Sequence, residues 1–257
     1  MDAEIVLGFL TGVLIATVTA PVGVSGAVFL LPVQLSVLHV ANPAVTPTNL
    51  IYNVIAGPGA LVKYRRNGQL AGPLARLLMA GTVPGVIVGA VVRVFLLPGE
   101  RPFRIIAGLV LLGIGVWLVV RSLHTHQTRE PLSTRAIFTT ALVVGVVGGL
   151  YGIGGGSILS PILVGSGLAV ATVAPAALTS TFVTSIVGAL RFAVLAPFAD
   201  GSTAPDVPIG IACGLGGLLG GYLGARLQPR LPERALRLLL GGLASTTGVL
   251  YLVQGLR

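Results

Sequence analysis

Long apolar segments with almost no internal charge follow one another along the whole chain. We mark eight, at residues 4–38, 44–63, 72–97, 103–121, 135–170, 173–197, 207–226 and 234–253. Most match the roughly 20 residues that a helix needs to cross a bilayer. They lack the alternating pattern of barrel strands, and lipid admits only helices or closed barrels because each backbone polar group needs a partner. The sequence therefore predicts an all-α polytopic membrane protein.

Composition and charge agree with a chain that lies in a lipid bilayer. Charged residues make up 9% of the 257 residues and hydrophobic residues 54%, whereas soluble domains carry about 25% charged residues. The net charge of +9 comes from basic residues that fall mainly between the apolar segments, which is typical of membrane orientation rather than of nucleic-acid binding. The single Cys213 allows no disulfide within the chain. The acidic start at Asp2 and Glu4 predicts that no signal peptide is cleaved.

Two of the segments, 4–38 and 135–170, are too long for one span and are interrupted by Gly and Pro. The interruptions are Ala20–Gly26, followed by Pro32, and Gly149–Ser157, followed by Pro161. Glycine lowers helix propensity and proline removes a backbone donor. We interpret each segment as two short helices that meet at a bend, with helical pieces beginning at residues 26 and 156.

The interruptions belong to an internal repeat. Gly23, Gly26 and Pro32 recur as Gly152, Gly155 and Pro161, each 129 positions later, and the series continues towards the C-terminus with a small insertion. We therefore divide the chain into a first transmembrane repeat at 1–122, a polar linker at 123–134 and a second repeat at 135–257. Each repeat contains one broken segment followed by three spanning helices.

Loop charge decides between parallel and inverted repeats. If each broken segment enters and leaves on one side, the repeats are inverted and both termini face the outer side. Eleven basic residues then fall inside and four outside, as the positive-inside rule requires, whereas the parallel arrangement gives no bias. The inside residues are Lys63, Arg65, Arg66, Arg76, Arg121, Arg129, Arg135, Arg226, Arg230, Arg234 and Arg237, and the outside residues are Arg93, Arg101, Arg104 and Arg257. We expect the inverted architecture of many secondary transporters.

Broken helices in such transporters place helix ends at the midplane, where free N–H groups and a partial positive charge attract an anion. The candidates are Ser25, Gly26 and Ala27 in the first repeat and Gly154, Gly155, Gly156 and Ser157 in the second. Added bulk, for example Gly155→Leu, should then reduce anion binding. The alternative is that these glycines serve close helix packing.

Polar side chains share one helical face in the segment that follows each interruption. Asn49 and Asn53 do so in the first repeat, and Ser180 and Thr184 in the second. Amides and hydroxyls can line an anion site or form hydrogen bonds between helices. Arg191 is the one charge that we place within a span, and it either contacts substrate or extends to the interface.

Side chains for other chemistry are few. The acidic residues lie at segment ends or in loops, and the sequence shows no carboxylate pair, metal-ligand cluster or nucleophile–base pattern. We therefore expect no enzyme activity, metal or cofactor, and we leave open whether H⁺ or Na⁺ drives transport. The alternatives to a transporter are a non-transporting membrane subunit and an intramembrane enzyme.

The run from Gly149 to Pro161 resembles the TauE/SafE family of sulfite and organosulfonate exporters, and the resemblance continues through Thr179–Thr181 and Gly188–Arg191. It implies a secondary transporter in the bacterial plasma membrane, and its substrate would be sulfite, an organosulfonate or a related anion. The first repeat departs from the family's glycine cluster, because Val24, Ser25 and Ala27 add side-chain volume there. We predict an exporter that binds a small anion between the two broken segments.

Overall fold

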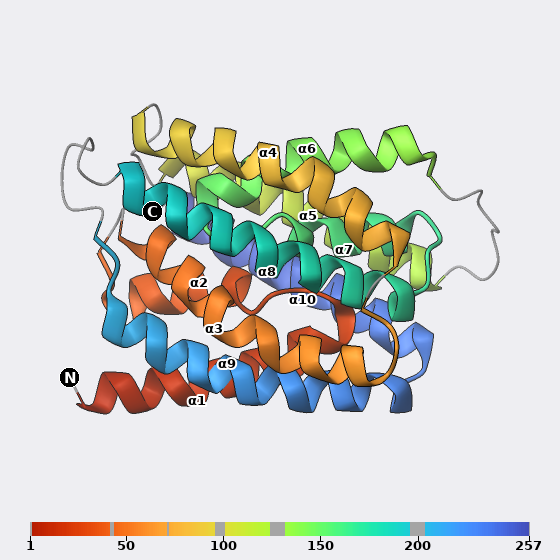
Figure 1. Cartoon of the computed structure of the whole chain (residues 1–257), viewed down its shortest axis with the longest axis horizontal. Coiled ribbons are helices and arrows are strands. Elements are labelled where there is room, and N and C mark those ends of the chain that lie inside the picture. The colour runs from red at the N-terminus through yellow and green to blue at the C-terminus, as the bar shows by residue number, and fades with distance from the viewer. Residues whose placement is uncertain are drawn as a thin grey trace.

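The structure is a computed structural model that describes residues 2–41, 44–70, 72–95, 101–123, 132–195 and 204–256. Its regular structure is entirely helical in these ranges. The elements are α1 (Asp2–Thr19), η1 (Ala20–Val22), α2 (Ala27–Ser36), α3 (Val45–Arg66), α4 (Pro73–Phe95), α5 (Arg101–Leu123), α6 (Thr134–Tyr151), α7 (Gly156–Gly165), α8 (Val170–Leu195), α9 (Val207–Leu227), η3 (Gln228–Arg230) and α10 (Glu233–Leu256). The long helices lie side by side along the long axis of the molecule (Figure 1).

Within the described residues, six helices are long and apolar enough to cross a membrane, namely α1, α4, α6, α8, α9 and α10. Helices α3 and α5 are comparably long, at 22 and 23 residues. Large apolar side chains face outward, including Leu14, Val143 and Leu190, which are 67%, 64% and 64% exposed. An apolar exterior of this kind is stable against lipid rather than water. The chain is therefore a multi-pass membrane protein, as the apolar segments predict.

Glycines allow two pairs of helices to approach until their backbones touch. At the contact of α1 with α9, a Cβ on Gly12, Gly216 or Gly220 would collide with a carbonyl oxygen of the facing helix. At the contact of α4 with α6, the same holds for Gly85 and Gly149. Close approach supplies the van der Waals contacts that hold helices together in lipid, where apolar burial gives little drive. The abundance of glycine thus has a packing cause.

The short helices α2 and α7 lie among the long ones, and each has 10 residues. Two details differ from the sequence interpretation. The pieces that precede them, α1 and α6, are not short but have 18 residues each. The second segment, predicted to extend to residue 170, ends earlier, because Gly167 adopts a φ of 110° after α7, and α8 begins at Val170. Residues 124–131 of the predicted linker lie outside the described ranges.

Candidate functional site

The chain leaves helical geometry at glycines in the same two places that the sequence marks. Gly23, with a φ of 75°, follows η1, and Gly152 and Gly154, with φ values of 65° and 70°, follow α6. These φ values lie in the left-handed region that side chains other than glycine rarely adopt. A Cβ on Gly23 would also collide with the backbone of Ala174 in α8. We call residues 20–26 the first break and residues 152–155 the second break.

The first break touches α7, the helix that follows the second break, although about half of the chain separates them. The backbone N–H of Ser25 donates to Ser157 Oγ at 3.1 Å, and Ser160 Oγ donates to the carbonyl of Val22 at 2.5 Å. From α3, Asn53 Nδ2 donates to the carbonyl of Gly152 at 3.2 Å, while Asn53 Oδ1 accepts from Ser25 Oγ. The structure thus brings together Ser25, Asn53 and Ser157, which the sequence singles out separately.

Side chains from distant helices satisfy carbonyls that lie in or beside the first break. Tyr64 Oη donates to Ala20 at 3.1 Å and Gln228 Nε2 donates to Pro21 at 2.6 Å. At the start of α2, Asn49 Nδ2 donates to Ala27 at 3.0 Å and Tyr251 Oη donates to Val28 at 2.8 Å. Non-helical backbone at membrane depth is stable only where its polar groups find partners in the protein. The predicted residue Asn49 therefore holds the start of α2 in place.

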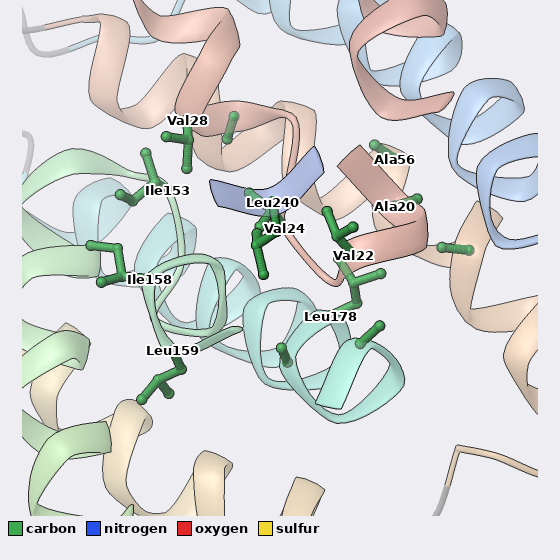
Figure 2. Close-up of a cluster of buried hydrophobic side chains, with 14 of the residues drawn as sticks. Ala20, Val22, Val24, Val28, Ala56, Ile153, Ile158, Leu159, Leu178 and Leu240 are labelled. Atoms are coloured by element: carbon green, nitrogen blue, oxygen red, sulfur yellow. The ribbon is translucent and has the colours of Figure 1, made fainter. Parts of the chain in front are cut away.

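Apolar side chains close around the breaks. Val22 and Val24 come from the first break, Ile153 from the second and Ile158 from α7, and they belong to one buried cluster that Leu240 of α10 also joins. Figure 2 shows Val22 and Val24 close to Leu240, with Ile153 and Ile158 nearby. The hydrogen bonds between the breaks are thus formed in a low-dielectric setting, where they are stronger than in water.

The glycines of the second break are packed against neighbouring helices. A Cβ on Gly154 would lie 2.6 Å from Thr181 Cγ2, and one on Gly155 would lie 2.6 Å from Thr82 Cγ2. A Cβ on Gly156 would collide with the carbonyl oxygen of Ala177, and one on Gly26 with Tyr52 Oη. The structure thus shows at these glycines the close helix contacts that the packing alternative requires. As a result, Gly155→Leu would disturb helix packing as well as the binding of any ligand. This variant therefore does not distinguish a packing role of Gly155 from a binding role.

The other predicted residues take no part in the hydrogen bonds that connect the breaks. Ser180 Oγ and Thr82 Oγ1 share a hydrogen bond of 2.8 Å between α8 and α4, and Thr184 Oγ1 donates back to carbonyls of its own helix. Arg191 is partly exposed and lies ten residues beyond Thr181, or about 15 Å along α8. The hydrogen bonds of Ser180 and Thr184 are those of helix packing, and Arg191 lies far from the breaks.

Sequence reasoning missed two features. Arg93 of α4, which the charge count assigned to an outer loop, is only 5% exposed and interacts electrostatically with Tyr151. Because Arg93 lies only two residues before the end of α4, the sequence pattern did not distinguish it from a loop residue. The second feature is a cavity of about 30 Å³ beside the first break. Its polar lining residues are Thr19, Ser25, Tyr52, Asn53 and Thr181, and Ala60 and Gly221 also line it.

A bundle of apolar helices, with two short helices whose first turns meet through hydroxyls and an amide, defines a polytopic membrane protein with a polar centre. Comparison of the sequence with models of known protein families identifies the family of the chain. The sequence matches "Sulfite exporter TauE/SafE" over residues 8–251. The chain belongs to this family of membrane transporters, as its glycine-rich motif indicates. No curated protein matches the sequence.

Proposed function

We propose that this transporter exports a small anion, such as sulfite, an organosulfonate or a related oxyanion, across the bacterial plasma membrane. The anion binds near the bilayer midplane, where the two breaks meet. The observation that carries this proposal is the direct contact of Ser25 with Ser157, supported by Asn53. This contact brings the starts of α2 and α7 together, and helix starts favour negative charge.

We also propose that the two halves form an inverted repeat. The packing partners support it: α1 packs on α9 as α6 packs on α4, α3 on α9 as α8 on α4, and α5 on α10. Such exchanged partners are expected when one half is related to the other by a two-fold axis in the membrane plane. Helices α1 and α6 also start at opposite ends of the bundle, and the marked N and C termini lie at the same end (Figure 1).

The orientation of the protein in the membrane is open to a direct test. Lys63, Arg65 and Arg66 end α3, and Arg226 ends α9, so this end of the bundle should face the cytoplasm. We expect a C-terminal reporter that is active only outside the cytoplasm to give a signal, and a cytoplasm-specific reporter to give none. A strong signal from the cytoplasmic reporter would contradict the inverted arrangement.

Export also fits the position of the cavity. Its lining extends from Ser25 to Ala60 and Gly221, which lie three residues before Lys63 and five before Arg226. The cavity is therefore nearer to the basic end than to the opposite one. With that end in the cytoplasm, the cavity lies where a substrate for export would be loaded.

Purified protein should bind and move a small anion. We expect sulfite or a sulfonate to raise the midpoint of thermal unfolding in detergent, because a ligand that binds only the folded state stabilises it. The same anion should enter or leave liposomes only when the protein is present. A panel of sulfite, thiosulfate, sulfate, sulfonates and carboxylates tests this. The proposal fails if folded protein neither responds to nor transports any member of the panel.

A further inference from the structure

Two threonines that line the cavity beside the first break have hydroxyl groups without a hydrogen-bond partner among the residues that the structure describes. Thr19 is the last residue of α1, and Thr181 lies in α8. The two residues are only 1% and 3% exposed, respectively. Both line the cavity, and neither Thr19 Oγ1 nor Thr181 Oγ1 forms a hydrogen bond. A buried hydroxyl without a partner is costly, and such a group in a native protein calls for an explanation.

The serines at the breaks, by contrast, have their hydrogen-bonding capacity in use. Ser25 Oγ donates to Asn53 Oδ1 and accepts from the N–H of Ala27. Ser157 Oγ donates to the carbonyl of Ile153 and accepts from the N–H of Ser25. These two hydroxyls hold the breaks together, so they have no proton left for a ligand. The hydroxyls of Thr19 and Thr181 still have a proton that can be donated to a ligand.

The position of Thr181 connects the cavity to the start of α7. A Cβ placed on Gly156 would lie 2.6 Å from Thr181 Oγ1, so the hydroxyl sits against the first residue of that helix. Thr19 lies where α1 ends and η1 begins. A ligand held between the two hydroxyls would therefore lie beside the first break and close to the N-terminus of α7.

The lining also limits the charge of the ligand. In the part of the chain that the structure describes, it consists of apolar, hydroxyl and amide groups and of glycines, without a Lys, Arg or His. The cost of removing an ion from water grows with the square of its charge, and a buried charge without a counter-charge is unfavourable. A doubly charged anion would therefore be far costlier here than a singly charged one. The volume of about 30 Å³ holds roughly two water-sized groups, which favours compact anions.

We infer that Thr19 and Thr181 donate the hydrogen bonds that bind the transported anion, and that the site takes it as a compact monoanion. This rests on the proposed function and names its site and the charge form of its substrate. Sulfite would enter as hydrogen sulfite, with the proton carried on the substrate. An aliphatic sulfonate, which is a monoanion throughout the physiological pH range, would need no proton.

Valine variants test the two hydroxyls, since valine keeps the shape of threonine. We expect Thr19→Val and Thr181→Val each to weaken binding of hydrogen sulfite at pH 6 by about tenfold or more, as for the loss of a hydrogen bond to a charged group. Their unfolding midpoints should equal or exceed that of the wild type, because each removes an unpaired buried hydroxyl. Thr19→Ser and Thr181→Ser, which keep the hydroxyl, should bind as the wild type does.

Matched controls lie two residues away on the same helices. Thr17 Oγ1 donates to Val13 at 2.7 Å and Thr179 Oγ1 donates to Pro175 at 2.7 Å, both within their own helix. Thr17→Val and Thr179→Val should leave affinity within about twofold of the wild type, since each side chain lies outside the cavity lining. Unchanged affinity in folded Thr19→Val and Thr181→Val proteins, or equal losses in the controls, would overturn the assignment.

The charge of the ligand is tested with the wild-type protein. Apparent affinity for sulfite should fall as pH rises through neutrality and the dianion takes over, whereas affinity for methanesulfonate should stay level. Sulfate should bind at least about tenfold more weakly than either. Equal binding of sulfate, or sulfite affinity that rises with pH, would overturn the monoanion assignment. If no anion binds the folded wild type, the proposed function itself fails, which is a different result.

Discussion

Replacing Asn53 with leucine should disconnect the two breaks and reduce anion transport at least about tenfold. The two side chains have similar size, so the change mainly removes hydrogen bonds. Asn53 is 2% exposed, and it joins Ser25 of the first break to the carbonyl of Gly152 in the second. Leucine leaves both groups buried without this partner, which should lower the free energy of unfolding by about 2–4 kcal/mol.

The measurement is anion flux in liposomes, together with the unfolding midpoint of the same preparation in detergent. Asn67→Leu is the control, because Asn67 is exposed and follows the last residue of the same helix, where substitutions usually change little. Asn53→Asp adds a further comparison. It keeps an acceptor for Ser25, but its carboxylate lines the cavity and should repel anions. Wild-type flux and stability in Asn53→Leu would show that the breaks hold together without this amide.

The helices were predictable because their signal is local. Runs of apolar residues between basic loops define spans such as α4 and α9, and the observed bounds differ from the predicted ones by a few residues at most. The end of α7 was not predictable from hydropathy. After Gly165, Ser166 and Gly167 form a turn inside an apolar run, and such a turn has the same local composition as a break within a span. Only packing, such as Gly165 against Trp117, distinguishes the two.

The site was predictable only in part, because its geometry depends on contacts between distant residues. Asn53 and Ser157 stand out as polar residues within apolar segments, and the structure places both at the breaks. Thr19 does not stand out, since threonines in membrane helices commonly bond to their own backbone, as Thr11 and Thr17 do. Thr19 forms no such bond to its own helix, and this difference depends on the side-chain conformation rather than on the sequence pattern.

Adding one methyl group to Gly156 should destabilise the protein by about 3 kcal/mol. In Gly156→Ala, the new Cβ would collide with the carbonyl oxygen of Ala177 in α8. Because this neighbour is a backbone atom inside a helix, it cannot rotate away. Helix α7 must therefore move away from α8. The unfolding midpoint in detergent and the monodisperse fraction after purification measure the effect.

Gly242→Ala is the matched control, because Gly242 lies inside α10 and an added Cβ there meets no atom within 4 Å. Alanine favours helix over glycine, so this variant should gain up to about 1 kcal/mol. Opposite signs from the same chemical change would show that the cost at Gly156 comes from packing against α8. If Gly156→Ala instead has the unfolding midpoint of the wild type, α7 is not closely packed against α8. Packing would then no longer explain why glycine occupies the start of α7.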